Sequence, residues 1–443
     1  MYKNIVFIMS RDMSPFPDFP IPSSWPTFLP QPKVREYLNN YSKEFHLENH
    51  IKFNHKVTQL KPFKEGWEVS YEKEGLLDKL YVDHVIVANG HNSCPIMPKF
   101  KGMDRFKGSI IHSTMYHDPS EFVGKRVVVV GSGTTSCDIA SEMSYVAKEV
   151  IISSRSGAYI FPRLTGAGKP VDLSLNRFLT WLIPSWLSNY LASNFILIPG
   201  TGWLKPKKLS LFEKSPAASA MMLERLASGS VLTEPGIDCF LEDAKSIRFT
   251  NGDIISDIDT VILATGYQLH FPFFTEKEVH KYVLGEQPSE KSSLENGPLW
   301  LHEGIFPPHY PSIAFLGLVF TLDSAMILSD VQIRYITSVW TDRVKLPKKA
   351  AMDSLLVKKK EHLPATQRSI WEPNQNYLND LAKICGFFPS FWSIVREHHS
   401  LSLAWKSWFS PRWPANFRLV GFGKWTGASN VIEQQYNDSS KSK

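Results

Sequence analysis

Uninterrupted runs of β-branched and aliphatic residues mark the most regular part of this chain. They stand at residues 127–130, at 150–152 within the expected strand 149–153, and at 261–263, and none of them alternates with polar positions. Such runs are typical of strands that are buried on both faces of a parallel sheet. Between the first two runs, residues 134–146 have the pattern of a helix. The order of these segments predicts a strand–helix–strand unit.

The remaining hydrophobic pattern predicts elements on both sides of this unit. Alternating residues favour strands in the N-terminal part and around Asn251–Gly252, a dipeptide typical of a hairpin turn. The expected strands are 51–60, 67–72, 80–88, 246–250 and 254–258, and the expected helices are 33–45, 349–370 and 378–385.

A glycine-rich turn separates the first buried strand from its helix. Gly131 and Gly133 flank Ser132, and small residues open the helix. Such a turn lets backbone N–H groups approach a phosphate, and a helix N-terminus favours negative charge. Ser136 replaces the usual third glycine and is still small enough for close packing of the helix on the strand. The pattern predicts a site for a dinucleotide pyrophosphate.

Arg155 follows the second buried strand. In doubly wound folds the residue at this point meets the adenosine ribose. An acidic residue there suits NAD, whereas an arginine suits the 2′-phosphate of NADP. We therefore expect NADP(H) to bind. If the glycine-rich turn and Arg155 are considered separately, the alternative explanation is a tight turn with a solvated arginine.

Two strands of the chain end at an Asn-Gly or Thr-Gly pair. Residues 85–88 are followed by Asn89–Gly90, and residues 261–264 by Thr265–Gly266. Two such strands are consistent with two nucleotide-binding units, although each alone is also an ordinary strand ending in a glycine turn.

Composition excludes several classes of function. The 443 residues give room for two or three domains, and their net charge of +6 is dispersed, which argues against nucleic-acid binding. The four cysteines form no CxxC pair, so neither a metal site nor a redox disulfide is expected. Residues 5–9 are too short for a signal peptide, and no segment is a confident transmembrane helix. The apolar segment 178–199 fits a buried helical insert or a helix pair on a membrane surface.

Residues 106–116 fit the pattern FxGxxxHxxx(Y/F), with Phe106, Gly108, His112 and Tyr116 at its fixed positions. This motif identifies flavin-containing monooxygenases, and the chain resembles that family from Tyr2 to about Gln435. Tyr116 favours this family over the Baeyer–Villiger group, which typically has tryptophan there. The lack of CxxC argues against the disulfide reductases of similar architecture. Further motifs in the family's order stand at 16–20, 125–140, 152–157, 263–267 and 417–421.

The resemblance implies an α/β fold with two dinucleotide-binding (Rossmann-like) domains, in which an NADP domain is inserted into an FAD domain. The expected parts are 1–120 for the first piece of the FAD domain, 121–268 for the NADP domain with an apolar insertion around 158–230, and 269–443 for the second piece with a helical region.

The implied activity is that of N,N-dimethylaniline monooxygenases, the NADPH- and O2-dependent oxygenation of nucleophilic nitrogen or sulfur in small molecules. FAD is the second implied cofactor. The vertebrate relatives lie on the endoplasmic reticulum membrane, although the polar end of this chain shows no anchor and a cytoplasmic location is open.

The predicted site consists of cofactor-binding residues alone. Its chemistry belongs to the cofactors and requires no side-chain nucleophile or base, so no catalytic residue is predicted. We expect His112 to position the domains rather than to transfer protons, and Cys137 to be a small packing residue. The predicted cofactor-binding residues are His112, Tyr116, Gly131, Ser132, Gly133, Thr134, Thr135, Ser136, Cys137, Asp138, Ser154, Arg155, Thr265 and Gly266.

The departures from the family concern the flavin. Members begin with a strand–GxGxxG–helix unit that holds the FAD pyrophosphate, whereas residues 1–4 align with residues that follow that unit. Ile8 stands where the family has a functional asparagine, and Phe320 where it has a glutamine. An apolar side chain makes none of the hydrogen bonds of an amide. The sequence therefore leaves open a family member that binds NADP(H) but is not catalytic.

Overall fold

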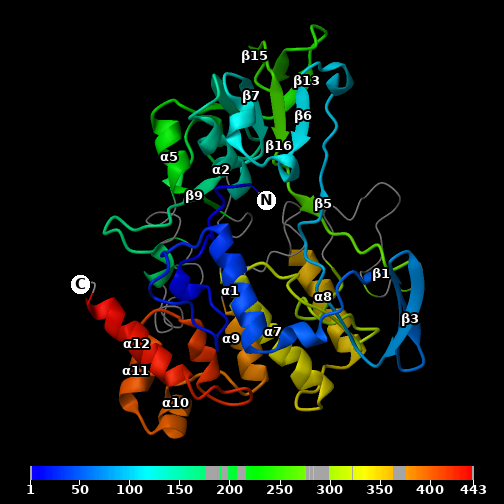
Figure 1. Cartoon of the computed structure of the whole chain (residues 1–443), viewed down its shortest axis with the longest axis vertical. Coiled ribbons are helices and arrows are strands. Elements are labelled where there is room, and N and C mark those ends of the chain that lie inside the picture. The colour runs from blue at the N-terminus through cyan, green and yellow to red at the C-terminus, as the bar shows by residue number, and fades with distance from the viewer. Residues whose placement is uncertain are drawn as a thin grey trace. The chain divides into compact units, whose positions relative to one another are not determined.

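The computed structural model describes residues 2–174, 187, 190, 198–206, 216–275, 279, 283, 299–321, 323–362 and 376–441 (Figure 1). The chain divides into two compact units, each assembled from separate segments. Unit 1 contains Met1–Ile8, Cys94–Asp172 and Ile183–Gln268, and unit 2 contains Met9–Ser93, Leu173–Leu182 and Leu269–Lys443.

Unit 1 is built on a five-stranded sheet in the order β12-β8-β7-β16-β6, in which every pair of neighbours is parallel. This sheet confirms the predicted α/β fold. Its three central strands are the three runs predicted from the sequence, whereas the two short edge strands were not predicted. The strands are β6 (Ser109–His112), β7 (Arg126–Val130), β8 (Glu149–Ser153), β12 (Leu232–Glu234) and β16 (Thr260–Leu263).

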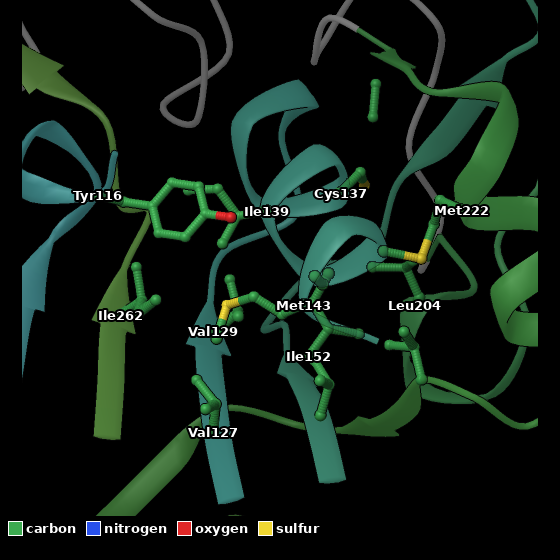
Figure 2. Close-up of a cluster of buried hydrophobic side chains, with 14 of the residues drawn as sticks. Tyr116, Val127, Val129, Cys137, Ile139, Met143, Ile152, Leu204, Met222 and Ile262 are labelled. Atoms are coloured by element: carbon green, nitrogen blue, oxygen red, sulfur yellow. The ribbon is translucent and has the colours of Figure 1, made fainter. Parts of the chain in front are cut away.

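Both faces of the central strands are covered, which explains why their residues are apolar without alternation. Val127 and Val129 of β7 lie in one core cluster with Ile139 and Met143 of α2 (Thr134–Met143) (Figure 2). Val128, whose side chain leaves the opposite face, lies in another cluster. The predicted helix 134–146 is therefore present, although it ends three residues earlier.

The second cluster is closed by a three-stranded antiparallel sheet. Its strands are β13 (Ile237–Phe240), β14 (Ile247–Phe249) and β15 (Ile254–Ile255). The predicted hairpin at Asn251–Gly252 joins the last two, and Gly252 has the positive φ, +95°, that such a turn requires. The remaining elements of unit 1 are β5 (Cys94–Pro95), β9 (Tyr159–Phe161), β10 (Ile198–Pro199), β11 (Ala217–Ala218), β17 (Tyr267–Gln268) and α5 (Ala220–Ala227).

Unit 2 contains an antiparallel meander and one parallel strand pair. The meander consists of β1 (Lys56–Phe63), β2 (Gly66–Lys73) and β3 (Leu76–Val82). Strand β4 (Val85–Val87) pairs instead with β18 (Ile313–Phe315). The prediction of one strand over 80–88 was therefore wrong, because the chain changes from one sheet to another within that segment.

Helices form much of the rest of unit 2. The predicted helices 33–45, 349–370 and 378–385 correspond to α1 (Gln31–Glu44), α8 (Lys349–His362) and α9 (Tyr377–Ile384), and residues 363–370 lie outside the described part. A long buried helix, α7 (Ala325–Trp340), was not predicted. The others are α10 (Phe391–His398), α11 (Leu401–Phe409) and α12 (Ala428–Lys441).

No described helix combines the length and the apolar character that crossing a bilayer requires. Most of the apolar segment 178–199, and with it part of the predicted insertion, lies outside the described residues.

Candidate nucleotide-binding site

Gly131 forms the first part of the turn between β7 and α2. Its φ is +137°, and a Cβ at this position would lie 2.4 Å from the carbonyl oxygen of Ala264. Ala264 follows β16 directly, and its N–H donates to the Val130 carbonyl at 2.9 Å. Glycine is needed here because the ends of two neighbouring strands approach each other. This contact is a requirement of the protein itself, separate from any ligand.

Gly133 is the N-cap of α2 and has a different environment. No side chain caps the helix, and a Cβ at Gly133 would meet no described atom within 4 Å. The first N–H groups of a helix have no partner within the helix, and the helix dipole favours an anion beside them. The uncapped N-terminus and the open space beside it therefore fit the predicted pyrophosphate.

The hydroxyl groups near this turn are used by the protein. Ser136 Oγ donates to the Gly133 carbonyl at 2.8 Å, and Thr134 Oγ1 accepts from the Ala218 N–H at 3.1 Å. Cys137 is fully buried in the core next to them. The side chains of Thr134 and Ser136 are therefore engaged with the protein's own backbone, and the feature of this turn that suits a ligand is the N-terminus of α2, which no side chain caps.

Arg155 lies at the carboxyl edge of the same sheet, in the loop that follows β8. Its side chain is exposed, and no described carboxylate lies within ion-pair distance of it. The loop is fixed by Ser154, whose Oγ accepts from the Gly157 N–H at 2.9 Å and whose N–H donates to the Glu234 carbonyl at 2.9 Å. The loop thus holds an exposed guanidinium on a fixed backbone.

His112 connects the end of β6 to the turn that follows β16. Its Nε2 lies 3.1 Å from the Gly266 carbonyl oxygen, and its Nδ1 accepts from the Thr114 N–H at 3.2 Å. These contacts assign the proton to Nε2. Burial lowers the pKa of the imidazole, which favours the neutral ring. Because both ring nitrogens are engaged by backbone groups, the geometry favours a positioning role.

Thr265 and Gly266 complete this connection. Thr265 Oγ1 donates to the Ile96 carbonyl at 2.6 Å, and the Ile96 N–H donates to the Gly266 carbonyl at 3.0 Å. Gly266 has a φ of +86°, which places it in the left-handed region. The turn after β16 is therefore held by β6 on one side and by the segment at Ile96 on the other.

Asp138 of α2 and Tyr116, which follows β6, each take part in a partly buried hydrogen bond between a tyrosine and a carboxyl group of α2. The Tyr2 hydroxyl donates to Asp138 Oδ2 at 3.1 Å, and the Tyr116 hydroxyl donates to Glu142 Oε2 at 2.9 Å. Burial is the main cause that raises the pKa of both carboxyl groups. The carboxylate of Asp138 is thus engaged with the N-terminal segment of the chain, which the sequence pattern did not indicate.

Two family motifs of unit 2 meet in a buried ionic network. Asp18, from the loop at 16–20, lies 2.9 Å from Arg418 of the segment 417–421. Arg418 also contacts Asp330 of α7, which lies 3.7 Å from Arg334. Arg334 Nη1 donates to the Phe417 carbonyl at 2.7 Å. The sequence reasoning missed Asp330 and Arg334, because it predicted no helix over α7.

Ile8 and Phe320 carry their apolar side chains partly into solvent. Ile8 in unit 1 is 40% exposed, and Phe320 in unit 2 is 38% exposed. Phe320 follows β18 in a loop where the Gly317 N–H donates to Gln332 Oε1 at 3.0 Å. Neither side chain supplies the amide that the family has at its position.

Comparison with known proteins agrees with these features. The model of the FMO-like family, described as flavin-binding monooxygenase-like, matches residues 1–443. Flavin-containing monooxygenase 3 of Rattus norvegicus is 32% identical over 468 residues, with 100% of this chain and 83% of the relative covered. 

Solved structures show the same fold. S-allyl-L-cysteine S-oxygenase from Allium sativum has a TM-score of 0.64 at 21% identity, with 100% of this chain and 84% of that chain covered. Cyclohexanone monooxygenase from Rhodococcus sp. Phi1 bound to NADP+ has a TM-score of 0.61 at 17% identity, with 87% and 89% covered. With the family model matched along its whole length, the chain belongs to the flavin-binding monooxygenase-like family.

Proposed function

We propose that unit 1 is an NADP(H)-binding domain and that the chain carries out NADPH- and O2-dependent oxygenation of nucleophilic nitrogen or sulfur in small molecules. One observation carries the first part of this proposal. The uncapped N-terminus of α2 at Gly133 and the exposed Arg155 lie at the carboxyl edge of one parallel sheet. This edge is where open α/β sheets bind nucleotides.

The residues of the site act by binding and orientation. The backbone N–H groups of the first turn of α2 hold the pyrophosphate of NADP(H), where the helix dipole favours its charge. The Arg155 guanidinium binds the 2′-phosphate through charge-assisted hydrogen bonds. His112 and Gly131 fix the ends of β6, β7 and β16 around the turn. When bound, NADPH supplies a hydride and FAD supplies the reaction of reduced flavin with O2.

The substrate class rests on the family and on the relatives. The garlic protein similar to this chain is named an S-oxygenase of a cysteine derivative, which supports sulfur as one acceptor. Nitrogen is the second acceptor, as in the N,N-dimethylaniline monooxygenases that the sequence resembles. A location at the endoplasmic reticulum membrane, also taken from the family, is part of this proposal and is tested by cell fractionation.

A second candidate function is NADP(H) binding without oxygenation. Ile8 and Phe320 favour it, because each replaces an amide of the family by an apolar side chain. Oxygen consumption separates the two candidates. The purified chain is supplied with FAD, NADPH and either a tertiary amine or a sulfide, and its absorption spectrum is recorded for bound flavin. Substrate-dependent O2 uptake with an oxygenated product supports the first candidate, whereas NADPH binding without uptake supports the second.

The binding part of the proposal is tested by Gly133→Val. We expect NADPH affinity to fall by at least about 100-fold, because the side chain fills the space beside the helix N-terminus. The thermal midpoint should stay near that of the wild type. Gly166→Val is a matched control, since a Cβ there also meets no described atom within 4 Å. Unchanged NADPH affinity in Gly133→Val would show that this turn does not hold the phosphates.

A further inference from the structure

We propose that Gly236 determines nucleotide specificity by positioning Arg155 for the 2′-phosphate of NADP(H). This inference rests on the proposed NADP(H) site and adds a residue to it that no sequence motif indicated. Gly236 lies in the segment between β12 and β13 and is separated from Arg155 by a long stretch of chain.

The aliphatic part of Arg155 lies against Gly236. A Cβ at position 236 would stand 3.0 Å from Arg155 Cγ and 3.8 Å from its Cδ. The methyl group of Thr250 is 3.9 Å from the same point. Gly236 is buried, whereas Arg155 is exposed. The side chain of Arg155 therefore runs across the open side of Gly236 and beside Thr250, with its guanidinium in solvent.

The backbone of Gly236 does not itself require a glycine. Its φ lies outside the left-handed region that side chains rarely adopt. The side-chain atom nearest to a Cβ at this position is Cγ in the stem of Arg155. The missing side chain is thus explained by the space that Arg155 occupies, rather than by a turn.

The segment that carries Gly236 is fixed at several points. The Thr250 N–H donates to the Gly236 carbonyl at 2.9 Å, and Ser153 Oγ donates to the Pro235 carbonyl at 2.6 Å. The Ser154 N–H donates to the Glu234 carbonyl at 2.9 Å. Because this backbone is tied to both β8 and the β14–β15 hairpin, a side chain at 236 would move Arg155 rather than the backbone. A shift at Cγ is passed on to the guanidinium at the end of the side chain.

The hairpin also engages a carboxylate of the segment that carries Gly236. Glu234 lies two residues before Gly236, and its Oε2 accepts from Asn251 Nδ2 at 3.3 Å. Asn251 belongs to the hairpin turn that follows β14. The hairpin therefore makes two contacts here, since Thr250 lies beside the stem of Arg155 and Asn251 hydrogen-bonds to Glu234.

The test compares Gly236→Ala, Gly236→Val, Arg155→Ala and the double variant Arg155→Ala/Gly236→Ala. Affinities for NADPH and NADH are measured by calorimetry, with Gly166→Ala as a control. A Cβ at 236 requires the Arg155 stem to shift by a few tenths of an ångström. The resulting strain in its side-chain torsions should weaken NADPH binding by about 2- to 12-fold in Gly236→Ala and leave NADH binding unchanged. Gly236→Val should weaken it further. In the Arg155→Ala background, Gly236→Ala should have no additional effect.

The outcomes separate this inference from the proposed function. If the wild type does not prefer NADPH, or Arg155→Ala does not remove the preference, the proposed function fails. If the preference depends on Arg155 but Gly236→Ala matches the wild type, or weakens both nucleotides equally, the role of Gly236 is refuted. An equal effect of Gly236→Ala with and without Arg155 also refutes it. Should Gly236→Val fail to fold, the alanine variants decide the question alone.

Discussion

At the scale of single residues, two glycines of one turn have separate tasks. Gly131 accommodates the Ala264 carbonyl and a φ of +137°, whereas Gly133 borders open space at the helix N-terminus. The sequence predicted the turn and both glycines, but it assigned them together to the turn or the phosphate. The sequence could not distinguish the tasks of the two glycines, because the contact of Gly131 is with Ala264, which follows β16. Strand β16 is distant from β7 in the sequence and adjacent to it only in the sheet.

Gly131→Ala should destabilise the fold more than Gly133→Ala does. The alanine must adopt a φ that side chains rarely accept, and its Cβ would overlap the Ala264 carbonyl oxygen. We expect a loss of about 1–3 kcal/mol in the free energy of unfolding. Urea unfolding measures this, and Gly133→Ala serves as the matched control with little loss. Equal stability of the two variants would contradict the assignment of Gly131 to the packing of the turn.

At the scale of elements, α2 presents two partly buried carboxyl groups one helical turn apart. Asp138 and Glu142 each accept a hydrogen bond from a tyrosine, and the rings of Tyr2 and Tyr116 lie 5.9 Å apart. Coulombic attraction by Arg163 acts against the burial effect on the pKa of Asp138, but burial is the larger cause. The helix thus keeps two acids in surroundings that favour their protonated forms.

The stability of the chain should therefore contain a component that decreases as pH rises. The folded-state pKa of both carboxyl groups is raised above the unfolded value, so the folded state binds these protons more tightly. The two carboxyl groups make their full contribution to stability below the ordinary carboxyl pKa of about 4. This contribution is lost as pH rises through the pKa values of the folded state.

Asp138→Asn/Glu142→Gln should reduce this dependence. Urea unfolding of the variant and the wild type between about pH 4 and 7 should show a smaller loss of stability with rising pH in the variant. Glu121→Gln, a change of an exposed acid in the same unit, is the control and should leave the dependence unchanged. Identical profiles for the double variant and the wild type would show that these two groups do not cause it.

Elements with a clear hydrophobic pattern were predictable from the sequence, and others were not. The uninterrupted runs of β7, β8 and β16 predicted the centre of the parallel sheet, whereas the edge strand β12 has only three residues and gave no pattern. Helix α7 escaped prediction because it is buried on most of its surface, so it lacks the polar stripe that marks a surface helix.

At the scale of the whole molecule, the two units are interleaved along the chain. The sequence predicted two nucleotide-binding domains and the family, and the matching family model confirms the family. The sequence did not predict that residues 2–8 lie in unit 1, where Tyr2 contacts α2. That contact depends on one hydrogen bond and on burial between distant segments, which leave no periodic trace in the sequence.

The central claim is that unit 1 binds NADP(H) and distinguishes it from NAD(H) through Arg155. Calorimetric titration of the wild type and of Arg155→Ala with NADPH and NADH tests it most directly. The wild type should bind NADPH more tightly than NADH, and Arg155→Ala should weaken NADPH binding by about 10- to 100-fold while changing NADH little. Equal affinity of the wild type for both nucleotides, or an equal loss for both in the variant, would contradict the account.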